Sequence, residues 1–180
     1  MNFNQQLLIA LPDMQDPRFK HAVILICEHN ENGAMGLVLN HAMDLDTDDI
    51  FEDLELTIPD KNQTVLNGGP LNQNSGFIIH NSPKLYKSSL KIHETLTLTT
   101  SNDILEEIAT NQFKYDWLFF LGYSGWSDNQ LEDEIALNTW LTAPIDNNLI
   151  FNTCIKKKWQ QTLAHIGIHD VNSITGVGHA

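Results

Sequence analysis

The residues whose types and spacing could support catalysis are Cys27 and His29, which lie two positions apart. On a β-strand, side chains with this spacing lie on the same face, so the thiol and the imidazole could approach each other. A neighbouring histidine lowers a thiol pKa and makes a cysteine a nucleophile or a redox sensor. Glu28 would point to the opposite face. The other interpretation is that Cys27 is a small core residue, because free cysteine is among the most buried residue types.

A second candidate nucleophile, Ser124, lies in Gly122-Tyr123-Ser124-Gly125-Trp126, between an apolar strand candidate and a helix candidate. A hydrolase nucleophile elbow requires Gly-x-Ser-x-Gly, but here the second glycine comes one position early. We therefore interpret these residues as a turn held by aromatic packing. The run Asn67-Gly68-Gly69-Pro70 lacks the Lys and Ser/Thr of a phosphate-binding loop. It predicts a sharp turn that needs glycines, and such a turn could also let the backbone approach another segment closely.

No metal site and no cofactor are predicted. His165 and His169 have the helical spacing of a metal-binding pair, but Gly167 between them favours the end of a helix. No third ligand is close in sequence. His179, next to the C-terminus, is the remaining candidate for a thiol-dependent site, because the fold could bring it towards Cys27.

The charge distribution argues against direct nucleic-acid binding. The formal net charge is -13, and Asp and Glu are the only charged residues between positions 44 and 60. Such a stretch repels phosphate backbones and acidic membranes. The one dense basic run, Lys156-Lys157-Lys158, is a weak nucleic-acid patch. We therefore expect a partner that is a protein or a small-molecule ligand.

The sequence shows no pattern typical of a targeting signal. No apolar run approaches the roughly twenty residues of a membrane span, and the N-terminal residues lack the basic region and long apolar run of a signal peptide. The two cysteines, Cys27 and Cys154, have neither the number nor the spacing of a disulfide framework. We therefore expect a cytoplasmic protein with no membrane partner.

The elements that must position these residues are organised around a β-hairpin at residues 22–40. Its two apolar runs flank Asn32-Gly33, which favours a type I′ turn with these two residues at its centre. The first run, Ala22–Ile26, is apolar at every position, which is typical of a strand covered on both faces.

The rest of the chain mixes strand and helix patterns. Period-two alternation predicts strands within 88–100, and apolar runs predict strands at 117–121 and 149–151. Capping residues and apolar periodicity predict helices that begin near Asp46, Ser101 and Ser127, and one over 155–166. These patterns predict an α+β fold with one domain over residues 1–180. Its mixed, mostly antiparallel sheet would form a barrel-like core with about four flanking helices.

Short motifs spread over nearly the whole chain resemble the AlgH/YqgE family of bacterial proteins. Their order and spacing make the match specific. The motifs are Leu8-Ile9-Ala10-Leu11-Pro12, Asp16-Pro17-Arg18-Phe19, Ile26-Cys27-Glu28-His29-Asn30, Asn32-Gly33-Ala34-Met35-Gly36, Gly68-Gly69-Pro70, Thr99-Thr100-Ser101, Leu121-Gly122-Tyr123-Ser124-Gly125-Trp126, Gln130-Leu131-Glu132-x-Glu134-Ile135, Trp140-Leu141-x-Ala143-Pro144 and Gly178-His179-Ala180. One departure is visible: the family usually has Asn-Lys-Pro or Asn-Arg-Pro where this chain has Asn40-His41-Ala42.

The resemblance implies a compact α+β fold with a barrel-like mixed sheet. Members are often labelled transcriptional regulators, and their biochemical activity is treated as unknown. The recurring motifs suggest a shared surface near loops. Its candidate residues in this chain are Cys27, Glu28, His29, Asn30, Asn40, Gly68, Gly69, Pro70, Tyr123, Trp126 and His179.

Two functional hypotheses follow. The favoured one is a non-catalytic binding or regulatory protein that presents this loop-lined surface, because no complete catalytic constellation is present. Any effect on transcription would then be indirect. The alternative is a thiol-dependent enzyme or redox sensor that uses Cys27 with His29.

Overall fold

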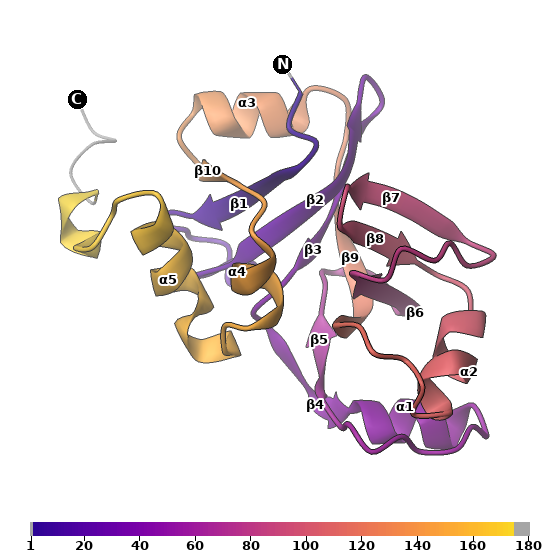
Figure 1. Cartoon of the computed structure of the whole chain (residues 1–180). Coiled ribbons are helices and arrows are strands. Elements are labelled where there is room, and N and C mark those ends of the chain that lie inside the picture. The colour runs from indigo at the N-terminus through magenta and orange to yellow at the C-terminus, as the bar shows by residue number, and fades with distance from the viewer. Residues whose placement is uncertain (1, 175–180) are drawn as a thin grey trace.

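The computed structural model describes residues 2–174 and has an α+β architecture (Figure 1). Within these residues, the strands are β1 (Gln6–Ala10), β2 (Val23–Asn30), β3 (Gly33–Val38), β4 (Ala42–Asp46), β5 (Thr64–Asn67), β6 (Leu71–His80), β7 (Ser89–His93), β8 (Leu96–Thr99), β9 (Trp117–Trp126) and β10 (Trp140–Pro144). The α-helices of the same range are α1 (Thr47–Asp53), α2 (Asp103–Ala109), α3 (Gln130–Ala136), α4 (Asn147–Phe151) and α5 (Lys158–His165). Short 3-10 helices cover Ile155–Lys157 and Val171–Ser173.

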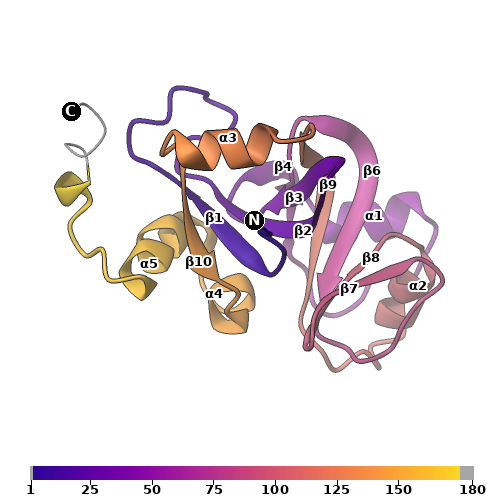
Figure 2. The same ribbon diagram turned by 90° about the horizontal axis from the view of Figure 1, so that it is seen from above.

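The strands form one curled sheet in the order β10-β1-β2-β3-β9-β6-β8-β7, with β5 beside β9 and β4 beside β5. Every pairing is antiparallel except that of β5 with β9. The edge strands β10 and β7 lie on opposite sides of the molecule, so the sheet is an open half-barrel (Figure 2). The predicted fold class is therefore confirmed. The described residues contain five α-helices where the sequence predicted about four.

Two predicted elements are wrong at the level of the local structure. Residues 149–151 are the end of α4 and not a strand, because the Asp146 side chain accepts hydrogen bonds from the backbone N–H groups of Asn148 and Leu149 and caps a helix there. Residues 122–126 are not a turn but the second half of β9.

Strand β9 bends at Gly122 and joins the two halves of the sheet. Its first half pairs with β5 and β6, and residues Ser124 to Trp126 pair with β3. Gly122 has φ 77°, and a Cβ at this position would overlap the Gly69 carbonyl oxygen. Glycine is required at the bend, because an L side chain would be both strained and obstructed there.

The hairpin of β2 and β3 is present, with its turn one residue earlier than predicted. Asn30 pairs with Gly33, so Glu31 and Asn32 are the central residues. Neither of them has a positive φ, and Gly33, with φ 127°, already belongs to β3. Gly33 is needed for close packing, because a Cβ there would overlap the Trp126 carbonyl oxygen of β9.

Both faces of β1 and β2 are covered, as their unbroken apolar sequences predict. Alternate residues such as Leu7 and Leu25 join a cluster with Trp159 and Leu163 of α5, which we call the α5 core. The intervening residues, such as Ile24, join Leu131 of α3 in what we call the α3 core. A third cluster, here the α1–α2 core, packs these two helices onto the far end of the sheet and contains Phe51, Leu105 and Phe119. No helix within residues 2–174 has the length and apolar character to cross a membrane.

Candidate functional site

A β-bulge in β2 separates the two residues that the sequence suggested as a catalytic pair. Ile26 pairs with Gly36 and Glu28 pairs with Met35, which leaves Cys27 as the extra residue. The side-chain alternation therefore shifts by one position after Cys27. Cys27 joins the α5 core, whereas His29 contacts Phe3 of the α3 core. The expectation that Cys27 and His29 share one face is wrong, because it assumed a regular strand.

The Cys27 thiol is part of the core. Its residue is 5% exposed, and its Sγ lies 3.7 Å from the Leu25 carbonyl oxygen. Burial, and to a smaller degree the nearby Glu28 carboxylate, raise the pKa of the Cys27 thiol far above its ordinary value. The thiol is therefore protonated at neutral pH, which is the state of a structural cysteine and not of a nucleophile.

His29 anchors the N-terminal segment and helix α3 to the hairpin. Its Nδ1 accepts a hydrogen bond of 3.0 Å from the Phe3 backbone N–H, so its Nε2 carries the proton and donates to Glu132 Oε1 at 2.5 Å. The Asn4 side-chain amide also donates to the His29 carbonyl oxygen. The Glu132 backbone N–H and His29 hold the pKa of the Glu132 carboxyl below its usual range. All hydrogen-bonding positions of the imidazole are thus in structural use.

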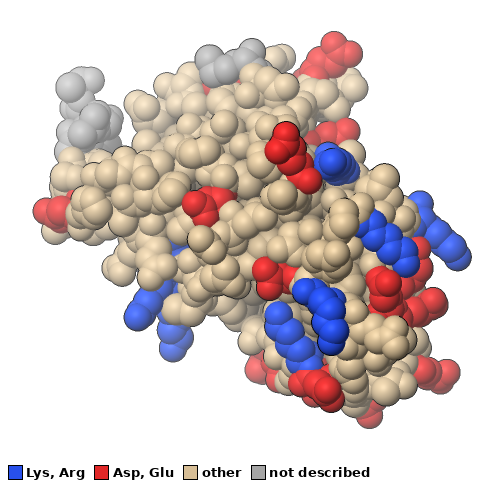
Figure 3. All heavy atoms as spheres, viewed as in Figure 1, with Lys and Arg blue, Asp and Glu red and all other residues tan. Residues whose placement is uncertain are grey.

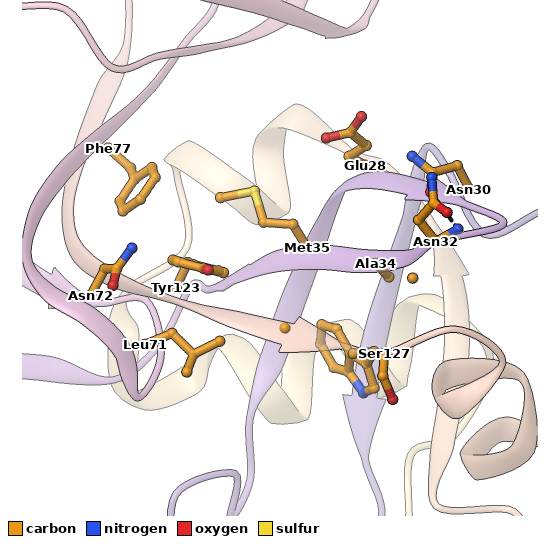
Figure 4. Close-up of a pocket in the computed structure, with 13 residues that line it drawn as sticks. Glu28, Asn30, Asn32, Ala34, Met35, Leu71, Asn72, Phe77, Tyr123 and Ser127 are labelled. Carbon is orange, nitrogen blue, oxygen red and sulfur yellow. Dashed lines mark hydrogen bonds between the residues drawn. The ribbon is translucent and has the colours of Figure 1, made fainter.

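Four of the predicted surface residues line one open hollow, which we call the hairpin groove (Figure 4). They are Glu28, Asn30, Tyr123 and Trp126. The groove has a volume of about 700 Å³. Its floor is formed by β3 and β9, and its walls by the hairpin tip and the curved start of β6.

The hairpin groove combines half-buried and exposed apolar groups with one carboxylate. Phe77 and Tyr123 form an edge-to-face pair with ring centroids 5.7 Å apart, and Met35 lies next to them (Figure 4). Leu71 is 43% exposed at the rim. Glu28 is the only charged residue of the lining, and within residues 2–174 it makes no ion pair or hydrogen bond through its carboxylate. Such a set can bind an amphipathic group.

The groove holds no catalytic constellation. Among the described residues, its lining contains no His, Cys, Lys, Arg or Asp, and the hydroxyl of Ser127 is bonded to the Gln130 side chain at 3.3 Å. Among residues 2–174, no three His, Cys, Asp or Glu side chains are placed to hold a metal ion. The arrangement provides contacts for binding but no paired nucleophile and base.

The Gly68-Gly69-Pro70 segment lies directly beside the bend of β9. The Gly68 carbonyl oxygen accepts hydrogen bonds from the Ser124 hydroxyl at 3.1 Å and from the Val38 backbone N–H at 3.0 Å. A Cβ at Gly68 or Gly69 would overlap the backbone of β9. The close backbone approach that the sequence left open is therefore present, and it is made against β9, which forms part of the groove floor. Ser124 is fully buried in this contact.

Other predicted candidates lie away from the groove. The Asn40 side chain is buried, accepts a hydrogen bond from the Val23 N–H and donates one to the His21 carbonyl oxygen, so it fixes the start of β2. The Nε2 atom of His165 lies 3.7 Å from Oδ2 of Asp146. His179 lies outside the described residues.

A neighbouring hollow of about 280 Å³ shares Trp126 and Leu71 with the groove and adds Pro70 and Trp140; we call it the Trp hollow. The indole N–H groups of Trp126 and Trp140 both donate to Glu134 Oε2, at 2.9 and 2.8 Å. Glu134 of α3 thereby links Trp126 of β9 and Trp140 of β10 through hydrogen bonds.

Sequence reasoning missed Glu134, although it lies in a motif that carried the family resemblance. It also missed Met35, Leu71 and Phe77, whose residue types are typical of a core. Only the pairing of β3, β6 and β9 shows that these three side chains surround an open space.

Both the sequence and the fold of this chain are similar to those of known proteins. The sequence model of a family described as AlgH-like matches residues 7–170. UPF0301 proteins of Photobacterium profundum and Salmonella paratyphi A, the second named YqgE, are each 42% identical to this chain, with 100% of both chains covered. The solution structure of AlgH from Pseudomonas aeruginosa has a TM-score of 0.78 at 35% identity, covering 99% of this chain and 96% of AlgH. A crystal structure from Corynebacterium diphtheriae, with a TM-score of 0.71 at 21% identity over 92% and 87% of the chains, supports the fold alone.

Proposed function

We propose that this chain, which belongs to the AlgH-like family, is a non-catalytic binding protein that holds a segment of a partner protein in the hairpin groove. The observation that supports this is the grouping of Met35, Leu71 and Tyr123 beside the unpaired Glu28 carboxylate. Apolar contacts with a single charge at the rim suit an apolar side chain flanked by a Lys or Arg. The groove is open along one side, and enclosed pockets are the rule for small molecules.

The regulatory role that we propose acts through this partner and not through DNA. The chain carries a net charge of -13, which opposes the approach of a phosphate backbone. On the face viewed in Figure 3, Lys and Arg side chains are mixed with Asp and Glu and do not form one basic patch. We also propose a cytoplasmic location, supported by the free cysteines Cys27 and Cys154.

Site-specific photo-crosslinking in cells tests the proposal. A photoreactive amino acid replaces Asn32 at the rim of the groove, and a matched variant carries it at the exposed Gln160 of α5. We expect one discrete protein adduct from the Asn32 position that the Gln160 position does not form. Introducing Met35→Asp into the Asn32 variant should remove the adduct.

Identical adducts from both positions, or an adduct that survives Met35→Asp, would contradict the proposal. A small-molecule adduct at Asn32 that lacks any protein would also overturn it. Circular dichroism of each variant confirms that the fold is retained, which keeps a lost adduct from being a folding defect.

A further inference from the structure

A second hollow lies on the other side of the sheet, between α1 and α2, and we call it the interhelix groove. It has a volume of about 370 Å³ and lies over β6 and β9. Its floor is apolar and includes Ile78, Phe119 and Leu121. Figures 1 and 2 both show α1 and α2 at the same end of the molecule, and Figure 1 shows that this end lies far from the β2–β3 hairpin tip.

The walls of the interhelix groove add apolar groups, of which Leu54 is exposed, Ile50 is half-buried and Leu105 is buried. Ile50 and Leu54 line it from the α1 side, and Leu105 lines it from α2. Leu54 is 38% exposed, which is high for a leucine that borders an apolar floor. Ile78 and Phe119 are themselves buried, so the apolar surface open to a partner comes from Leu54, Ile50 and the half-buried floor residue Leu121. Such a surface suits an apolar side chain of a partner.

Both helices that flank this groove carry acidic residues and no basic ones. Helix α1 contains Asp48, Asp49, Glu52 and Asp53, and α2 contains Asp103, Glu106 and Glu107. Asp53 lines the groove, and Glu106 is an exposed residue of α2 that follows the lining residue Leu105 in the sequence. Within residues 2–174, neither Asp53 nor Glu106 makes a side-chain hydrogen bond or ion pair. In the part of the chain that the structure describes, none of the residues that line the groove is Lys or Arg.

We propose that the interhelix groove binds a basic amphipathic segment of a partner protein. Its apolar residues would contact the floor between the helices, and Lys or Arg residues on its two flanks would pair with Asp53 and Glu106. The two helices have seven residues each, so the walls are about 10 Å long and match roughly two turns of a helical segment. This surface is separate from the hairpin groove, and the two share no lining residue.

The test uses synthetic helical peptides with Leu at the i, i+3, i+4 and i+7 positions. One peptide carries Lys at all other positions, and its counterpart carries Glu. Binding is followed by amide chemical-shift changes and by calorimetry. We expect the Lys peptide to shift the amides of α1, α2 and β6, and the Glu peptide to bind nowhere.

Paired variants identify the site. Asp53→Asn with Glu106→Gln should weaken the Lys peptide about five-fold, because each exposed ion pair contributes less than about 1 kcal/mol. The control, Glu31→Gln with Asp128→Asn, removes the same charge at the hairpin turn and before α3, and it should leave the affinity unchanged. Leu54→Ala should also weaken binding. Shifts spread over the whole acidic surface or confined to the hairpin groove, equal affinity of the two double variants, or no binding of the Lys peptide would each overturn the proposal.

Discussion

Replacing Glu134 should destabilise the fold, because one carboxylate oxygen accepts hydrogen bonds from two tryptophans. Trp126 is 7% exposed and Trp140 is 3% exposed, so neither indole N–H has free access to bulk water. The second oxygen of Glu134 accepts a bond from the Gln130 side chain at 3.0 Å. The Glu134→Ala variant removes all three bonds and leaves two buried donors unpaired.

The expected loss of stability can be worked out from the two indole N–H groups that lose their acceptor. Each buried polar group that loses its partner costs about 1–3 kcal/mol, so two of them give about 2–6 kcal/mol. Both tryptophans line the Trp hollow, whose volume of about 280 Å³ is large enough for a water molecule to replace the lost acceptor, so we expect a loss near the lower end, at about 2–3 kcal/mol. Glu134→Gln keeps an acceptor oxygen but loses the charge, and it should cost about 1 kcal/mol.

Urea unfolding followed by tryptophan fluorescence measures these losses. The control is Asp133→Ala, which removes an exposed carboxylate on the same helix and should change the free energy of unfolding by less than about 0.5 kcal/mol. The two indole N–H resonances of the native protein should also move in Glu134→Ala. A loss in Glu134→Ala no larger than that in Asp133→Ala would refute the hydrogen-bonding argument.

Three further predictions concern buried groups. Cys27 should resist alkylation in the native protein while the exposed Cys154 reacts, and labelling of Cys27 at a comparable rate, measured by mass spectrometry, would contradict the core assignment. Lys158→Met should lower the free energy of unfolding by about 2–3 kcal/mol in urea titrations, because the Lys158 ammonium donates to the carbonyl oxygens of Leu149 and Ile150 at 2.6 and 2.8 Å at the end of α4. Burial lowers the pKa of His80 from 6.5 to about 4. Between these two pH values, His80 is therefore protonated in the unfolded chain and neutral in the folded protein. Stability should therefore fall as the pH drops from 6.5 towards 4, and a His80 resonance that titrates near 6.5 in the folded protein would refute this.

Strands with strong local patterns could be predicted from the sequence, and those that depend on remote partners could not. Ala22–Ile26 is apolar throughout, and burial on both faces follows from that alone. Residues 122–126 contain two glycines and look like a turn in isolation. They form a strand because β3 supplies hydrogen-bonding partners from a segment that lies far away in the chain. The hairpin groove could not be predicted from the sequence for the same reason, because its lining residues come from β2, β3, β6 and β9.

The bulge at Cys27 determines what the motif in β2 can do. In a regular strand, Glu28 would lie on the opposite face of the sheet from Cys27. The thiol of Cys27 and the imidazole of His29 would then lie on the same face. With one extra residue, Cys27 and Glu28 turn to the same side of the sheet, where the thiol enters the α5 core and the carboxylate reaches the hairpin groove. His29 then faces α3, and its ring nitrogens are both engaged. A pattern that suggests a nucleophile in the sequence therefore supplies a binding carboxylate and a structural histidine in the fold.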